Sequence, residues 1–280
     1  MDSKLLRIYQ LQDGYCYNSD SLILFDFIKR FIKRQKTLLD VGAGSGILGL
    51  LCGRDFGLEA SLVEQDLHNA FLCAQNARLN GVRAKIFHGD FFNLQFGGKF
   101  ECIISNPPFY RAGILDSQND KIKRARNERF LPLESLCKQV KRLLHPKGDF
   151  IFCYDAKESH RVFATLQNSG FNAQTCRFLH PRSDKEATLV LIQAKIATKA
   201  SLKILPPLFT HQSKLQTDNT PEVRAIYAAC NTYSIKVQSS DICPQELANF
   251  TKAQNLEQNH PQSHSQTSEQ TAQTCHKGDL

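Results

Sequence analysis

One short stretch, residues 100–110 (FECIISNPPFY), carries groups that could hold a small flat molecule still. The turn Asn106-Pro107-Pro108-Phe109 follows an apolar run, and it is stiff and extended because both prolines lack an N–H and fix φ. The side-chain oxygen of Asn106 and the carbonyl oxygen of Pro107 could accept the two hydrogens of an exocyclic amine. The Phe109 ring could lie against the face of a planar base. The stretch therefore predicts a site for a flat heterocycle that carries an amine.

A glycine-rich turn follows the first strand-like run, at residues 38–46 (LLDVGAGSG). The glycines of this turn are Gly42, Gly44 and Gly46. They leave room for a ligand near the N–H groups that open the next helix. A dinucleotide-binding turn would place its third glycine at position 47, which is Ile47. Asp40, at the strand end, is a poor neighbour for a pyrophosphate and a good partner for an ammonium group.

The next two strand ends carry further polar groups. Glu64 closes the apolar run 60–63 and follows Gly42 by 22 residues. A carboxylate at this spacing can accept hydrogen bonds from both ribose hydroxyls of a nucleotide cofactor. A third strand, residues 82–87, is closed by the segment 88–91 (HGDF). Four successive strand ends thus carry groups suited to binding, and such ends meet at the carboxyl edge of an open α/β sheet.

Apolar runs that alternate with helical patterns predict an α/β fold with a mostly parallel sheet. Strands are expected at residues 37–41, 60–63, 82–87, 100–104, 150–154, 174–179 and 187–194. Helices are expected at residues 21–34, 46–54, 66–79, 132–144, 159–168 and 221–229. Residues 8–17 suggest a small hairpin or a lid. Asn18, Ser19 and Asp20 are candidates for the N-cap of the first helix.

Composition divides the chain into four segments. They are a lead segment with its helix at residues 1–35, a catalytic domain at 36–211, an extension at 212–250 and a tail at 251–280. The tail is rich in Gln, Ser, Asn, His and Thr and has little to bury, so disorder is expected there.

The Asn-Pro-Pro-aromatic string matches the signature of amino-methyltransferases, which use S-adenosylmethionine to methylate exocyclic amines of bases or the amide of a protein glutamine. The glycine turn resembles the cofactor loop of class I S-adenosylmethionine-dependent methyltransferases. The resemblance implies a Rossmann-like α/β fold, with a seven-stranded, mostly parallel sheet covered by helices on both faces. It implies that Asp90 and Phe91 hold the adenine ring of the cofactor. It gives the catalytic roles to Asn106, Pro107 and Phe109, with Pro108 and Tyr110 on the substrate side.

Several further segments, between residues 8 and 211, resemble the bacterial tRNA1(Val) adenine-N6 methyltransferase family. They are GYCYNSDSLILFDF at 14–27, VEQ at 63–65, GDFF at 89–92, ARNER at 125–129 and LPPL at 205–208. The resemblance implies methyl transfer to the N6 amine of an adenosine beside the anticodon of a tRNA. It also implies that Asp20 lies near the entrance for cofactor and substrate, although an N-cap role explains Asp20 equally well.

The net charge of +8 and the pI near 9.0 favour a polyanionic partner, and nucleic acid is the commonest. The basic residues after the proline turn are Lys121, Lys123, Arg124, Arg126 and Arg129. They form either a solvated helix face or a contact with RNA phosphates. The partner expected from charge and resemblance together is tRNA.

The cysteines indicate a reducing cytoplasm and no metal site. Ten cysteines are scattered through the chain without a C-x-x-C pair, so neither a zinc ribbon nor a redox dithiol is indicated. No signal-peptide region or membrane-length apolar run is present, so no membrane association is expected. The choice between a monomer and a homodimer is open.

Other functions are compatible with parts of the sequence. A glutamine-N5 protein methyltransferase and an rRNA guanine-N2 methyltransferase would use the same Asn-Pro-Pro-aromatic turn. A nicotinamide oxidoreductase is disfavoured by Ile47. A non-catalytic RNA-binding module with a vestigial cofactor site would bind tRNA without transferring a methyl group.

Overall fold

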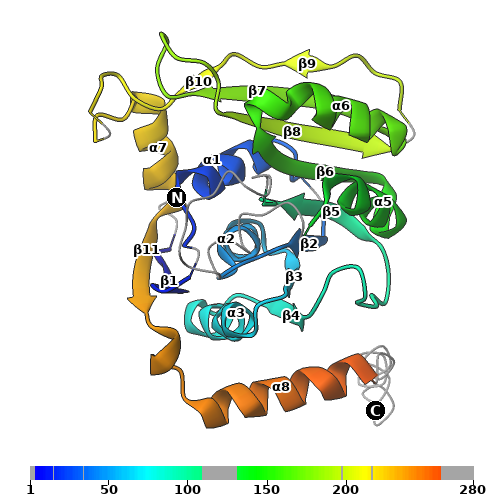
Figure 1. Ribbon diagram of the computed structural model, residues 1–280, viewed down its shortest axis with the longest axis vertical. Helices are drawn as coiled ribbons and strands as arrows, with labels where there is room; N and C mark the ends of the chain where they lie inside the picture. The colour runs from blue at the N-terminus through cyan, green and yellow to red at the C-terminus, as the bar shows by residue number, and fades with distance from the viewer. Residues whose placement is uncertain are drawn as a thin grey trace, which may run out of the picture.

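The computed structural model describes residues 4–14, 16–33, 35–108, 131–196, 198–215 and 217–259. A central sheet is covered by helices on both faces (Figure 1). The strand order is β10-β7-β8-β6-β5-β2-β3-β4, with β9 beside β7. The predicted Rossmann-like α/β fold is therefore confirmed.

The parallel part of the sheet contains five strands. They are β2 (Thr37–Val41), β3 (Glu59–Glu64), β4 (Ala84–His88), β5 (Phe100–Ser105) and β6 (Leu144–Asp155). The helices between and after them are α2 (Ile47–Phe56), α3 (Leu67–Asn80), α5 (Leu133–Leu143) and α6 (Ser159–Asn168), with a 3-10 turn at Ala156–Glu158. β2 and β5 are neighbours in the sheet although β3 and β4 lie between them in sequence. The chain order reverses at that point, where open α/β sheets bind ligands.

Beyond β6, the sheet adds two long strands and two short ones. They are β7 (Phe171–His180), β8 (Leu189–Ile196), β9 (Lys203–Ile204) and β10 (Leu208–Phe209). β8 runs antiparallel to both β6 and β7. The seven predicted strands are all present, and the two-residue strands β9 and β10 extend the edge.

Two apolar clusters fill the space on the two faces of the sheet. In β5, Cys102 and Ile104 belong to one cluster and Ile103 to the other, because successive side chains of a strand point to opposite faces. The first cluster takes in α1 (Ser19–Ile28), α2 and α3, and the second takes in α5 and α6. All three side chains are fully buried, which explains why these strands are continuous apolar runs.

The beginning of the chain pairs with a segment near its end. β1 (Leu6–Leu11) lies parallel to β11 (Thr232–Val237), which follows α7 (Pro221–Cys230). The prediction of a hairpin at residues 8–17 is wrong, because the partner strand of β1 is more than 200 residues away and not in the next segment. Figure 1 shows the two strands side by side, next to α3.

Two asparagines of α3 occupy the other edge of β1. Asn76 accepts from the Tyr9 N–H at 2.8 Å and donates to the Tyr9 carbonyl at 2.9 Å. Asn80, one turn further on, makes the same pair of contacts with Arg7 at 2.9 and 2.7 Å. The carboxamides thus replace a strand partner, which fixes β1 against the helix that follows Glu64.

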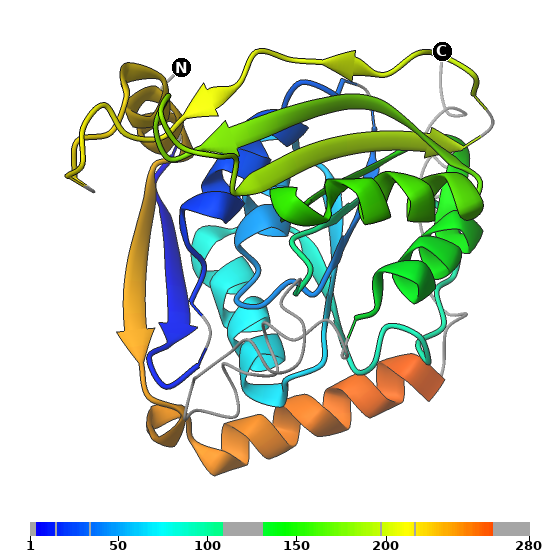
Figure 2. The same cartoon turned by 45° about the horizontal axis from the view of Figure 1, so that its top comes forward.

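A long helix, α8 (Pro244–Asn259), closes the described part of the chain after a 3-10 turn at Ser239–Asp241. It lies along α3, below the sheet in Figure 2. Phe250 packs edge-on against Phe71 with ring centroids 5.9 Å apart, and the buried Gln254 accepts from the His88 N–H at 3.1 Å. The predicted disorder is therefore wrong for residues 251–259, which belong to this helix. The rest of the predicted tail lies outside the described residues.

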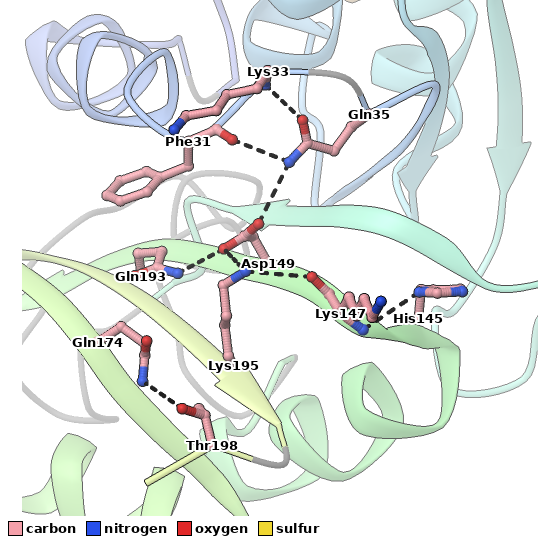
Figure 3. Close-up of polar contacts among 10 residues, drawn as sticks. All are labelled: Phe31, Lys33, Gln35, His145, Lys147, Asp149, Gln174, Gln193, Lys195 and Thr198. Atoms are coloured by element: carbon pink, nitrogen blue, oxygen red, sulfur yellow. Dashed lines mark hydrogen bonds and ion pairs between the residues drawn. The ribbon is translucent and has the colours of Figure 1, made fainter. Parts of the chain in front are cut away.

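A buried carboxylate links the sheet to the segment after α1. Asp149 of β6 accepts from Gln193 of β8 at 2.6 Å and pairs with Lys195 at 3.2 Å (Figure 3). Gln35 donates to its other oxygen at 3.5 Å. These contacts satisfy a buried charge, which would otherwise be costly, and they join neighbouring strands. We assign the cluster a structural role.

No helix in the described part of the chain has both the length and the apolar character that a membrane span requires.

Candidate active site

A cavity of about 590 Å³ opens at the carboxyl edge of the sheet, within the usual range for small-molecule sites. It lies where β2 and β5 meet, and in their register Val41 is opposite Ser105. The predicted site residues that line it are Asp40, Gly42, Gly44, Glu64, Asp90, Phe91, Asn106 and Pro108. The four strand ends thus converge on one hollow.

Of the predicted site residues in the described part of the chain, two are not among those lining the cavity. Gly46 caps α2 with φ +90°, and a Cβ there would lie 3.1 Å from Leu62 and 3.2 Å from the Cys73 thiol. Its role is therefore close packing of the helix start on the sheet. Pro107 is buried, and its carbonyl is the second amine acceptor that we propose below.

The glycine turn is held in place by its neighbours. Gly44 donates its N–H to Glu64 Oε2 at 2.8 Å, and its carbonyl accepts from the Cys73 thiol at 3.0 Å. Asn76 donates to the Ser45 carbonyl at 2.9 Å. Gly44 has φ +57°, and a Cβ added there would meet nothing within 4 Å. Hydrogen bonds with β3 and α3 residues thus fix the turn, while its Gly44 side stays open towards the cavity, as a ligand-binding loop requires.

Asp40 and Glu64 are two acids in a poorly solvated place. Asp40 is 1% exposed, and its Oδ2 accepts from the Gly49 N–H at 2.9 Å. Burial raises the pKa of Asp40 to about 7, with a smaller contribution from the charge of Glu64. Burial also raises the pKa of Glu64 to about 7, although the N–H groups of Asp66 and Gly44 oppose the shift. A ligand with a positive charge would stabilise both carboxylates.

Asp90 and Phe91 form the wall beyond β4. Asp90 accepts from the Phe92 N–H at 3.0 Å and from the Asn93 side chain at 3.1 Å. Phe91 is 4% exposed and packs against Phe92 and Phe96. This wall of the cavity therefore consists of a hydrogen-bonded turn at Asp90 and of Phe91, which belongs to an aromatic cluster.

Asn106 lines the same cavity, and both ends of its side chain are engaged. Its Nδ2 donates to Ser21 Oγ at 3.1 Å, and its Oδ1 accepts from the Cys153 thiol at 3.0 Å. The amide oxygen has a second lone pair, which is the one that a substrate amine would need.

The remaining predicted site residues lie outside the described residues. They are Phe109, Tyr110, Lys121, Lys123, Arg124, Arg126 and Arg129. Their roles stay predictions.

Sequence reasoning missed several residues of the site. Tyr17, Ser21 and Leu131 line the cavity although none follows a strand of the sheet. Asn18 is the N-cap of α1, which leaves Asp20 and Ser21 in the first turn. The motif around Asp20 pointed to this turn, but the side chain that contacts Asn106 is Ser21.

The residues of the cavity fit S-adenosylmethionine. Asp40 Oδ1 and Asn69 Oδ1 are buried without a hydrogen-bond partner among the described residues, and both residues line the cavity. Such acceptors suit an ammonium group or a hydroxyl. Glu64 and the open Gly44 backbone are placed for the remaining polar groups of the cofactor.

The fold and this cavity define a class I S-adenosylmethionine-dependent methyltransferase. The family model of the methyltransferase small domain matches residues 19–158. The chain belongs to that family.

Curated relatives agree with this assignment, and a solved structure shares the fold. A tRNA1(Val) (adenine(37)-N6)-methyltransferase of Dyadobacter fermentans is 27% identical over 195 residues, which are 69% of this chain and 81% of that protein. One of Vibrio cholerae is 26% identical over 197 residues, 68% of this chain and 80% of that protein. An Agrobacterium tumefaciens structure, described as a predicted O-methyltransferase, has a TM-score of 0.59 at 19% identity and covers 78% of this chain and 100% of its own. That likeness supports the fold alone.

Proposed function

We propose that this enzyme transfers a methyl group to the N6 amine of an adenosine in tRNA, beside the anticodon. The observation that carries the proposal is the convergence of Asn106 and the Gly44 turn on one cavity. The names of the relatives at 26–27% identity support adenine in tRNA as the target. With tRNA as the substrate, we expect the protein to act in the cytoplasm.

S-adenosylmethionine, when bound, supplies a methyl group activated by its sulfonium. The adenine amine is a weak nucleophile because its lone pair is delocalised into the ring. The Asn106 Oδ1 and the Pro107 carbonyl would accept its two hydrogens and favour a pyramidal nitrogen whose lone pair is free to attack. The resulting positive charge is relieved when a proton leaves for water, so the protein needs no general base before transfer.

Positioning supplies most of the expected acceleration. Holding two reactants in line lowers a barrier by up to about 7–11 kcal/mol. Stacking of Phe109 on the base would contribute roughly 1–3 kcal/mol to binding. Pro107 and Pro108 restrict the turn, which limits the motion of the acceptors. An adenosine in an anticodon loop is unpaired, so its presentation costs less than extrusion from a duplex.

The test is incubation with labelled S-adenosylmethionine and, in parallel, total tRNA, rRNA and a release factor. Nucleoside analysis should find the label as N6-methyladenosine from tRNA. Label in methylguanosine from rRNA would instead indicate a guanine-N2 methyltransferase. Label on the release factor would indicate a glutamine-N5 protein methyltransferase. Binding of tRNA without any transfer would favour the non-catalytic module.

A further inference from the structure

The Asn106 side chain is clamped by residues from two distant parts of the chain. Ser21 comes from the first turn of α1, and Cys153 comes from β6, the strand next to β5. The contacts are 3.1 Å from Asn106 Nδ2 to Ser21 Oγ and 3.0 Å from Cys153 Sγ to Asn106 Oδ1. Ser21 is 2% exposed and Cys153 is fully buried, which limits the access of water to the two partners of Asn106.

The two contacts differ in what they demand of the carboxamide. A serine hydroxyl can donate or accept, so Ser21 tolerates either end of the amide. A thiol donates its S–H hydrogen and its sulfur is only a weak acceptor, so Cys153 favours the oxygen end. Burial, together with the charge of Asp20, raises the pKa of the Cys153 thiol well above its ordinary value, which keeps the proton on sulfur. With the amide turned over, Nδ2 would face the sulfur, which is only a weak acceptor, and the contact from the thiol to Oδ1 would be lost.

We propose that Cys153, assisted by Ser21, is a positioning residue that keeps the oxygen of Asn106 oriented as an acceptor for the substrate amine. The inference rests on the proposed role of Asn106 and adds a specificity element to it. An oriented amide oxygen selects a base edge that carries an amine, whereas a reversed amide would present an N–H to a carbonyl-bearing edge. The orientation thus makes amine-bearing bases the substrate class.

The test compares two variants of Cys153 with a matched control. Cys153→Ala removes the donor, and Cys153→Ser keeps one. Cys102→Ala makes the same truncation at a buried cysteine of β5 in the same apolar cluster, away from Asn106 contacts. For each variant, kcat and KM for tRNA, the Kd for S-adenosylmethionine and the melting temperature are measured, with rates taken below the lowest melting temperature.

Cys153→Ala is expected to lower kcat about tenfold, the loss expected of about one hydrogen bond, with the cofactor Kd unchanged. Cys153→Ser should restore kcat to within about threefold of the wild type, because its hydroxyl also donates. Cys102→Ala should keep the wild-type kcat. Equal rates for Cys153→Ala and the wild type would overturn the inference. So would a serine variant as slow as the alanine variant, or an equal loss in Cys102→Ala.

Asn106→Ala separates this inference from the proposed function. An inactive Asn106→Ala beside a fully active Cys153→Ala would overturn the positioning role and leave the role of Asn106 intact. An active Asn106→Ala would overturn both.

Discussion

Asp40 and Glu64 show how single residues of the site are prepared for a charged ligand. Both carboxyl groups have pKa values raised to about 7, chiefly by burial. Asp40 Oδ1 has no partner among the described residues, whereas both oxygens of Glu64 accept backbone N–H groups, from Asp66 and Gly44 at 2.8 Å. The ligand-free protein therefore keeps two acids in an environment that disfavours their charge, which a cationic ligand would relieve.

The raised pKa of Asp40 predicts a pH-dependent stability. Between its ordinary value near 3.8 and about 7, the folded state holds a proton that the unfolded state has released. Stability contributed by that proton is lost as the pH rises through this window, by up to about 1.4 kcal/mol per pH unit. Without ligand, the free energy of unfolding should fall from pH 5 to pH 7.5.

Asp40→Asn keeps an acceptor for the Gly49 N–H but has no carboxyl group to titrate. In this variant, the free energy of unfolding should fall less steeply from pH 5 to pH 7.5 than in the wild type. Glu64 titrates in the same direction, so the slope should not vanish. The measurement is urea unfolding at a series of pH values. Identical slopes for the variant and the wild type would contradict the burial argument.

The Glu64 carboxylate is expected to hold the ribose of the cofactor. Glu64→Ala should raise the Kd for S-adenosylmethionine about tenfold or more, because the ribose contacts and the support of Gly44 are lost together. Glu64→Gln keeps one acceptor oxygen, so its Kd for S-adenosylmethionine should lie between the values of the wild type and Glu64→Ala. Titration calorimetry measures the effect, and an unchanged Kd in the alanine variant would refute the ribose role.

At the scale of elements, the cavity depends on two helices that carry none of the strand-end motifs. α3 fixes the glycine turn through Cys73 and Asn76, and α8 contacts the end of β4 through Gln254. The family match ends at residue 158, so α8 lies outside the matched residues. His88, which donates to Gln254, also lines the cavity.

Gln254→Ala is predicted to weaken cofactor binding about threefold to tenfold, the loss expected of one buried hydrogen bond. The end of β4 would lose the acceptor for the His88 N–H. Gln245→Ala is the matched control, since Gln245 sits on the same helix and contacts only the exposed Asn249 in the described structure. If calorimetry finds equal Kd values for the two variants, the contact from α8 does not support cofactor binding.

At the scale of the whole molecule, the first described strand pairs with a strand more than 200 residues later. β1 and β11 form a small parallel sheet next to α3, and α8 then runs below that helix (Figure 2). Asp13, just after β1, accepts from both the N–H and the hydroxyl of Ser239. β1, β11 and α8 therefore pack on the α3 side, and α3 fixes the glycine turn of the cavity.

The sequence predicts the sheet and its strand ends because both depend on local patterns. Apolar runs such as residues 100–104 are long enough to mark buried strands, and the groups after them must then share an edge. The pairing of β1 with β11 joins residues more than 200 positions apart, which no local pattern encodes. The contacts of Asn106 with Ser21 and Cys153 arise in the same way, since only the folded chain brings α1 and β6 together. α8 was missed because its sequence is mostly polar, and its few buried groups, such as Phe250, pack only on α3.

The account rests on Asn106 acting beside a bound methyl donor, and one comparison tests this most directly. Wild-type protein and Asn106→Ala are each saturated with labelled S-adenosylmethionine, with binding verified by calorimetry, and then mixed with tRNA in a single-turnover experiment. We predict rapid formation of N6-methyladenosine by the wild type and a loss of at least about a hundredfold in the variant, at an unchanged cofactor Kd. A variant that binds the cofactor and methylates tRNA at the wild-type rate would contradict the central claim.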